Sequence, residues 1–180
     1  MASLKLNLDV ARNLVSRDPH AAEALLLDLR TQSQAVIADI RRLAFDLRPP
    51  ALDEFGLIGA IQEYTRQIVN QDGLQIRLDS PQTLTALPAA VEVAAYRITL
   101  EALANFVRHS QGTNCQVSLA TTDHHLQIEV RDDGLGLPDE VKPGVGLSSM
   151  RERAAELGGT CAVETLPQGG THVLACLPLG

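Results

Sequence analysis

The first 47 residues constrain the fold most strongly, because they contain no glycine and carry one long heptad pattern. After Pro19, which suits a helix start, apolar residues recur in alternating steps of four and three for more than three heptads. A single amphipathic helix packed on its own domain would show a similar stripe, but the length of the seam favours a helical hairpin. Because such a hairpin has little core of its own, we expect a homodimeric four-helix bundle. The seam consists of Ala22, Leu26, Leu29, Ser33, Val36, Ile40, Leu43 and Leu47.

The pattern changes at Arg48-Pro49-Pro50, where the helical region ends because a residue before proline avoids the helical conformation. We place a domain boundary here, with residues 1–50 as the end of the helical hairpin and residues 51–180 as a second domain. A linker is expected after the prolines. A helix from about Gly56 to Asn70 follows, with its apolar residues at helical spacing.

Strand-like alternation dominates the rest of the second domain, interrupted by two long helices at about Pro88–Ser110 and Ser148–Leu157. A short turn around Asp123 joins the two central runs and predicts an antiparallel hairpin. The pattern predicts an α+β fold, a two-layer α/β sandwich with a mixed, mostly antiparallel sheet and helices on one face. The alternating runs lie at residues 74–78, 117–121, 126–130, 161–163 and 173–177.

Charge and composition exclude several classes of function. The formal net charge of −7 argues against non-specific nucleic-acid binding, which depends on Lys and Arg neutralising phosphates. No run approaches the roughly 20 apolar residues of a membrane helix. Polar residues interrupt the apolar residues near the N-terminus, whereas a signal peptide has an unbroken apolar stretch. We therefore expect a cytoplasmic chain without nucleic-acid or membrane contact, while a membrane anchor elsewhere in a longer protein stays open. Three scattered cysteines fit a reducing compartment and are each expected in the core: Cys115, Cys161 and Cys176.

Polar residues form a stripe on the otherwise apolar helix Pro88–Ser110. Arg97, Glu101, Asn105 and Arg108 follow one another at spacings that place them on one helical face. The stripe is either the solvated edge of the helix or the lining of a ligand site. In the second case, an Asn oxygen suits Mg²⁺, a Glu can act as general base and an Arg can meet phosphate.

Two glycine elements follow. Asp132-Asp133-Gly134-Leu135-Gly136 comes directly after a strand and permits close approach of a ligand, although an Asp-Gly hairpin turn is an alternative. Gly144-Val145-Gly146-Leu147 leads into a helix expected near Ser148, where Ser149 and Glu152 have capping-box spacing. Glycines before a helix N-terminus are typical of a phosphate site. The polar residues 137–143 between the elements are interpreted as a lid.

Neither of two common nucleotide motifs fits these elements. A P-loop requires a glycine followed by lysine, and no glycine here precedes a lysine. The dinucleotide fingerprint requires a third glycine where Ser149 stands and a strand immediately before it.

The ordered motifs resemble the ATP-binding domain shared by histidine kinases, gyrase-type ATPases, heat-shock chaperones and mismatch-repair proteins. Residues 101–109 are similar to the Asn-containing box, 132–136 and 144–147 to the two glycine boxes, and 169–171 to the last motif. The resemblance implies ATP and Mg²⁺ as ligands, with Asp132 accepting the adenine amino group and Asn105 holding Mg²⁺. It implies that Glu101 assists the phosphoacceptor histidine. The nucleotide would further contact Arg108, His109, Gly134, Gly136, Gly144, Gly146, Leu147 and Thr171.

Residues 47–53 and 147–154 narrow the resemblance to the nitrate-sensor-like subfamily of two-component sensor histidine kinases. This resemblance implies a homodimer that transfers the γ-phosphate of ATP to a histidine and then to an aspartate of a response regulator. Such regulators usually carry a helix-turn-helix output domain.

One departure concerns the phosphoacceptor, which the family carries in a His-Asp pair on the first bundle helix. None of the five histidines here precedes an aspartate, and His20 is expected in the loop between the bundle helices. We expect the acceptor upstream of Met1 in a longer protein, or a naturally degenerate chain, so that these 180 residues bind Mg-ATP without autophosphorylating. A degenerate dimerisation and regulator-docking module and a protein serine kinase of the anti-sigma type are the alternatives.

Overall fold

The chain forms two compact units, Met1–Leu47 and Arg48–Gly180. The computed structural model describes residues 18–23, 25–27, 29, 31, 48–72, 74–82, 84, 86–122, 124–138 and 145–180.

In the first unit, a helix begins at Pro19, as the sequence predicts. The backbone N–H of Ala21 donates to Asp18 Oδ1 at 3.0 Å, so Asp18 caps the helix, and proline suits the first helical position because it lacks an N–H. His20 lies in the first turn, so its placement in a loop is wrong. Leu29 is buried whereas Leu26 is 45% exposed. The seam positions from Ser33 to Leu47 lie outside the described residues.

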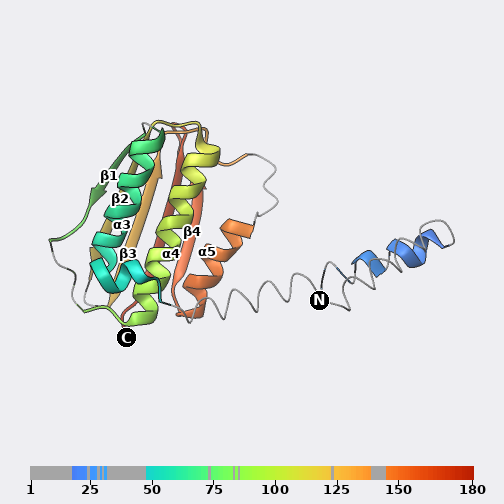
Figure 1. The fold of residues 1–180 in the computed structure, drawn as a ribbon, viewed down its shortest axis with the longest axis horizontal. Helices are drawn as coiled ribbons and strands as arrows, with labels where there is room; N and C mark the ends of the chain where they lie inside the picture. Colours follow the sequence, from blue (N-terminus) through green and yellow to red (C-terminus); the bar gives the residue numbers. More distant parts are fainter. Residues whose placement is uncertain are drawn as a thin grey trace. The chain divides into compact units, whose positions relative to one another are not determined.

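The second unit is a two-layer sandwich, as predicted. Its five-stranded sheet has the order β1-β2-β3-β5-β4, in which only the β1–β2 pair is parallel. Three helices cover one face of the sheet (Figure 1). The elements are α3 (Pro50–Asp72), β1 (Gln75–Asp79), α4 (Ala89–Asn105), the π-helix η1 (Phe106–Ser110), β2 (Asn114–Thr121), β3 (His125–Asp132), α5 (Val145–Glu156), β4 (Thr160–Thr165) and β5 (Thr171–Pro178).

The core lies between the sheet and the helices. Side chains alternate between the two faces of a strand, so each strand contributes every second residue to the core. One such row crosses four strands, where Leu78 pairs with Val117, Val117 with Val130, and Val130 with Val173. The covering helices contribute fully buried residues as well. These are Ile61 on α3, Ile98 and Leu103 on α4, and Met150 on α5.

The segment after the two prolines is helical, so the predicted linker is wrong. Helix α3 begins at Pro50, and Leu52 is only 2% exposed, which makes the segment part of the core. Gly56 interrupts the helix with a φ of 64°, which explains why periodicity placed the helix start there. Arg48 forms ion pairs of 2.5 Å with Asp53 in α3 and with Glu92 in α4, and so links the start of the segment to both helices.

Helix α5 starts at Val145, three residues before the predicted start. Ser149 therefore lies inside the helix, and its interpretation as the N-cap of a capping box is wrong. Sequence spacing alone cannot show which turn is the first, because Ser and Glu three residues apart also occur within helices.

The cysteines differ in their positions. Cys115 is in the core at 4% exposure, as expected, whereas Cys161 and Cys176 are half-buried. Cys176 pairs with Gln127, an exposed residue on the face of the sheet that the helices leave open, so its assignment to the core is wrong. In the part of the chain that the structure describes, no helix is both long and apolar enough to cross a membrane.

Candidate functional site

Asp132 stands at the end of β3, on the helix-covered side of the sheet, because it pairs with the core residue Cys115. Its Oδ1 accepts the backbone N–H of Gly134 at 2.9 Å and that of Thr171, the first residue of β5, at 3.1 Å. These two bonds fix the orientation of the carboxylate. Its Oδ2 has no hydrogen-bond partner among the described residues, so it is available to a donor on a ligand.

The neighbouring carboxylate, Asp133, has a structural role. Its Oδ1 accepts the backbone N–H groups of Thr113 and Asn114 at 2.8 and 2.9 Å, and its Oδ2 accepts the Asn114 amide at 2.6 Å. The bonds from Asn114 are the largest cause that lowers the pKa of Asp133. The two adjacent aspartates therefore have different roles, and of the two only Asp132 has an oxygen without a hydrogen-bond partner among the described residues.

The first glycine element requires glycine because backbone atoms lie against it. A Cβ on Gly134 would lie 2.3 Å from the carbonyl oxygen of Ser110, and Leu135 N donates to that same oxygen at 2.8 Å. Gly170, at a φ of 89°, lies against the backbone of Asp132, where a Cβ would be 2.0 Å from the carbonyl oxygen. The element leads on toward α5 rather than turning back into a strand, so the hairpin alternative is wrong.

Gly136 continues this loop at a φ of 80° and packs against Thr165 on β4. A Cβ on Gly136 would lie 2.4 Å from Thr165 Cγ2, and Leu137 N donates to Thr165 Oγ1 at 2.9 Å. The loop 133–138 is thus hydrogen-bonded to Ser110 at the end of η1 and to Thr165 at the end of β4. Nothing in the sequence marks Thr165 or Ser110 as part of this site, and Ser110 is expected there only as the end of a helix.

The polar stripe on α4 is partly buried. Glu101 and Asn105 are half-buried, and among the described residues neither makes a hydrogen bond or ion pair. Arg108 and His109 are exposed on η1, a wider turn that the sequence did not predict and that often marks a functional site. Because η1 replaces the α-helix after Asn105, α-helical spacing places the stripe on one face only as far as Asn105.

The second glycine element meets this stripe at the start of α5. A Cβ on Gly146 would lie 2.1 Å from Glu101 Oε1, so glycine allows the first turn of α5 to pack against that carboxylate. Leu147 follows in the same turn and is half-buried, whereas Gly144 lies outside the described residues. This contact places the first turn of α5 beside Glu101, before the C-terminal end of α4, and Figure 1 shows α4 and α5 as neighbouring helices.

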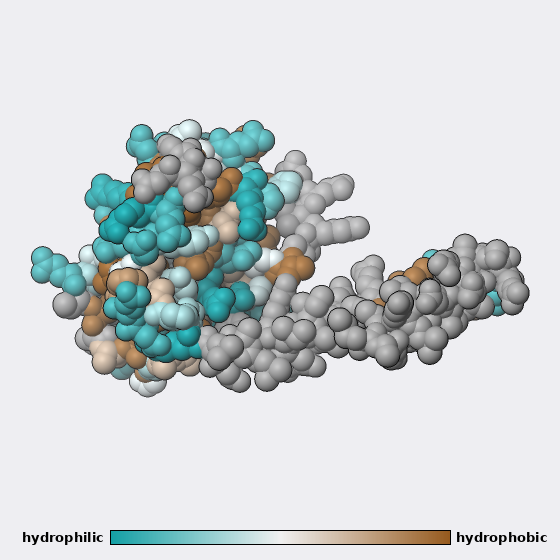
Figure 2. Space-filling model, in the orientation of Figure 1, coloured by the Kyte–Doolittle hydropathy of each residue, from teal (hydrophilic) through white to brown (hydrophobic). Residues whose placement is uncertain are grey.

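The helix side of the molecule has a mixed surface, with hydrophobic patches between hydrophilic residues (Figure 2). Two strongly exposed apolar residues, Leu135 and Val145, stand on either side of residues 139–144, at 68% and 62% exposure. The described residues contain no cluster of three or more His, Cys, Asp or Glu side chains that could hold a metal ion.

The predicted site residues fall into two contacting groups. Asp132, Gly134 and Thr171 form the first, linked through Gly136 to β4, and Glu101 with Gly146 forms the second. Asn105, Arg108 and His109 lie on the stretch of helix between Glu101 and Ser110, the residue that contacts Gly134.

Two protein families match this chain. Residues 90–180 match the family of histidine kinase-, DNA gyrase B- and HSP90-like ATPases, and residues 1–52 match a histidine kinase family. The chain is 30% identical over 185 residues to the signal transduction histidine-protein kinase/phosphatase DegS of Brevibacillus brevis. It is 28% identical over 179 residues to the oxygen sensor histidine kinase NreB of Staphylococcus carnosus. These alignments cover 99% and 97% of the chain but only 48% and 52% of the two relatives, so the chain spans about half their length.

The fold is likewise that of known histidine kinases. The histidine kinase domain of the blue-light activated histidine kinase from Erythrobacter litoralis EL346 superimposes with a TM-score of 0.61 at 19% identity, covering 99% of this chain and 93% of that one. At 19% identity this superposition shows only that the fold is shared, whereas the family matches show that the sequences are related. The ordered motifs, the sandwich that carries them and the two family matches together show that the chain belongs to the histidine kinase-, DNA gyrase B- and HSP90-like ATPases, in the sensor histidine kinase branch of that family.

Proposed function

We propose that the unit Arg48–Gly180 binds Mg-ATP at the end of the sheet where β3 ends and α5 begins. The observation that carries this proposal is the Asp132 carboxylate, whose Oδ1 is held by two backbone N–H groups while its Oδ2 is left without a partner among the described residues. The exocyclic amino group of adenine is a donor of the kind that this oxygen would accept.

The surrounding backbone supports a flat ligand in this position. Gly134 and Gly136 allow the loop to pack closely against Ser110 and Thr165, and hydrogen bonds to these two residues hold it, so a ring would meet a fixed backbone beside Asp132. The backbone N–H of Thr171, the first residue of β5, donates to the same carboxylate. These three residues are proposed to contact the adenine and ribose.

The α4 stripe and the start of α5 are proposed to hold the phosphates. Arg108 and His109 offer exposed donors, and the first turn of α5, with Gly146 and Leu147, offers backbone N–H groups and the positive end of the helix dipole. Gly144, outside the described residues, belongs to this proposal by family resemblance alone.

Asn105 is proposed to bind Mg²⁺ through its amide oxygen. Mg²⁺ prefers oxygen ligands and is commonly held by few protein groups, with phosphates and water completing the shell. The half-buried Asn105 amide, unengaged by other described residues, suits that arrangement. When bound, the ion would neutralise charge on the phosphates. Glu101, equally unengaged, is proposed as the base that takes the proton of the attacking group.

In the intact protein, we propose that this unit transfers the γ-phosphate to a histidine, from which it passes to an aspartate of a response regulator. The bundle formed by the N-terminal unit would supply the homodimer, and the regulator would carry a helix-turn-helix output domain. The reaction would take place in the cytoplasm. Since no His-Asp pair occurs in the 180 residues, this chain alone is expected to bind nucleotide without phosphorylating itself.

Calorimetric titration with Mg-ADP and Mg-ATP tests the nucleotide site. Asp132→Asn keeps an oxygen for the two backbone donors but turns the other acceptor into a donor. The change is expected to weaken binding about 10- to 100-fold, the cost of losing a hydrogen bond to a charged group. The matched control is Asp79→Asn, the same change on β1, where the carboxylate bonds to Gln116 on the open face. Absence of binding to the folded wild-type chain would refute the proposal.

Phosphoryl transfer requires a chain extended at its N-terminus with a His-Asp pair on the bundle helix. Radioactive phosphate that enters this chain and is released by acid identifies phosphohistidine. Acid-stable label in a partner protein would instead identify a serine kinase. Nucleotide binding without any transfer would favour the degenerate docking module.

A further inference from the structure

Thr165 belongs to the row of residues that contains the proposed adenine contacts. It is the last residue of β4 and pairs with Thr171 of β5, whose backbone N–H donates to Asp132 of β3. Each of the three lies two residues along its strand from a valine of the row that faces the helices, Val130, Val173 or Val163, and so stands on the helix-covered side of the sheet. Thr165 is therefore the next member of the row after Asp132 and Thr171.

The Thr165 side chain contacts the first glycine loop in two ways. Its hydroxyl accepts the backbone N–H of Leu137 at 2.9 Å. Its methyl group lies against the backbone of Gly136, where a Cβ would come within 2.4 Å. At the opposite end of the loop, the carbonyl oxygen of Ser110 accepts the N–H of Leu135. Thr165 therefore provides the second of the two anchors that hold the loop in place.

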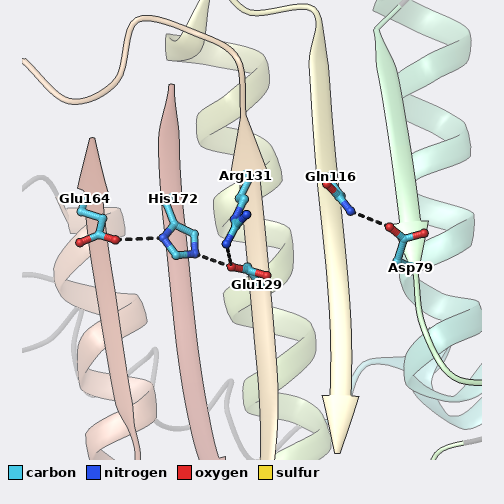
Figure 3. Close-up of polar contacts among 6 residues, drawn as sticks. All are labelled: Asp79, Gln116, Glu129, Arg131, Glu164 and His172. Atoms are coloured by element: carbon cyan, nitrogen blue, oxygen red, sulfur yellow. Dashed lines mark hydrogen bonds and ion pairs between the residues drawn. The ribbon is translucent and has the colours of Figure 1, made fainter. Parts of the chain in front are cut away.

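The strand that carries Thr165 is itself fixed from the open face of the sheet (Figure 3). The ring of His172 on β5 bridges two carboxylates, with Nδ1 3.0 Å from Glu164 Oε1 on β4 and Nε2 2.7 Å from Glu129 Oε1 on β3. His172 is buried at 8% exposure, whereas the Glu164 side chain at the β4 end of the bridge is 65% exposed. Because Glu164 directly precedes Thr165, this bridge holds the end of β4 in register with the strands that carry Asp132 and Thr171.

We propose that Thr165 is a positioning residue of the nucleotide site. Its hydroxyl holds Gly136 and Leu137 against the end of β4, so that the glycine loop keeps the shape in which a ring can lie beside Asp132. This inference rests on the proposed function, because it concerns the same site. It adds a residue that touches the loop rather than the ligand.

Two substitutions of Thr165 separate the role of its hydroxyl from its contribution to the strand. Threonine favours strands because it is branched at Cβ, and valine shares that shape and preference while lacking the hydroxyl. Thr165→Val therefore removes the acceptor and keeps the strand, and Thr165→Ser keeps the acceptor. Thr160→Val is the matched control, because Thr160 is an exposed residue at the other end of β4 and has no bond to the loop.

Three measurements on the full 180-residue chain test the proposal: the exchange rate of the Leu137 amide, the Kd for Mg-ADP, and the urea midpoint of unfolding. Thr165→Val is expected to speed Leu137 exchange and to raise the Kd about three- to tenfold, because the nucleotide must then order a loop that has lost one hydrogen bond. The midpoint is expected to fall slightly for the same reason. Thr165→Ser and Thr160→Val are expected to match the wild-type chain in all three.

The outcomes separate this proposal from the one on which it rests. If the wild-type chain binds Mg-ADP and Thr165→Val binds it equally well, the positioning role is refuted and the nucleotide site stands. The role is also refuted if Thr165→Ser loses as much affinity as Thr165→Val. If the folded wild-type chain binds no nucleotide, the proposed function fails, and the role of Thr165 fails with it.

Discussion

Replacing Gly170 by alanine would drive a methyl group into the backbone of the neighbouring strand. Gly170 has a φ of 89°, and an added Cβ would lie 2.0 Å from the carbonyl oxygen and 2.9 Å from the carbonyl carbon of Asp132. Neither atom can move aside as a side chain does, because both belong to β3. The matched control is Gly158→Ala, which also has a positive φ, 74°, but has nothing within 4 Å of an added Cβ.

The two substitutions share every cost except the collision. Alanine at a positive φ costs roughly 1–2 kcal/mol, offset by about 0.4–1 kcal/mol from the stiffer unfolded chain. Gly158→Ala should therefore lower the free energy of unfolding by only about 0.5–1 kcal/mol. Overpacking adds about 1–3 kcal/mol, so Gly170→Ala should cost about 2–4 kcal/mol. Because the displaced backbone is that of Asp132, Gly170→Ala should also lose nucleotide binding, and Gly158→Ala should keep it.

Urea unfolding followed by tyrosine fluorescence measures these free energies. The chain has two tyrosines and no tryptophan, and both tyrosines, Tyr64 and Tyr96, lie in the second unit, so the signal reports that unit alone. Equal destabilisation by the two alanines would refute the reasoning, since it would mean that β3 and β5 separate at no cost. A Gly170→Ala chain that binds Mg-ADP normally would contradict the predicted displacement of Asp132.

Three further predictions concern stability and reactivity. Hydrogen bonding lowers the folded pKa of Asp133 below its ordinary 3.8, so this contribution to stability is present above that pH and is lost as the pH falls further. The urea midpoint should therefore fall less steeply between about pH 5 and about pH 3 in Asp133→Asn, and an unchanged slope would contradict this. Burial raises the pKa of Cys115 to about 12, so iodoacetamide should leave it unmodified in the native protein and modify it after unfolding, as peptide mass analysis would show. Of the two carboxylates that pair with Arg48, Glu92 is 14% exposed and Asp53 66%, so Glu92→Gln should lower the urea midpoint more than Asp53→Asn, and the reverse order would count against the argument.

The strands could be predicted because the sheet has one buried face and one open face. Alternation at Leu126, Ile128 and Val130 follows directly from that asymmetry, and the burial of all three confirms it. The chain order of the glycine motifs was equally informative, because these residues are required wherever backbone must approach backbone. Gly134 beside Ser110 is such a place.

Features decided by contacts between distant segments could not be predicted. Pro49 and Pro50 suggest a linker in the sequence. In the structure Leu52 lies in the core and Arg48 is hydrogen-bonded to Glu92, 44 residues away, and neither contact has a local sequence signal. The π-helix at the end of α4 likewise has no local signature. Thr165 is ordinary in the sequence and becomes part of the site only through a hydrogen bond to Leu137, 28 residues before it.

The ion pairs of Arg48 determine where the second unit of this chain can be joined to another N-terminal segment. Because Leu52 is in the core and Arg48 pairs with both α3 and α4, a chimera joined at the apparent helix start, Gly56, would leave the recipient without a core residue and two ion pairs. A junction just before Arg48 keeps the whole second unit. A different N-terminal segment is therefore best joined to this unit on the N-terminal side of Arg48.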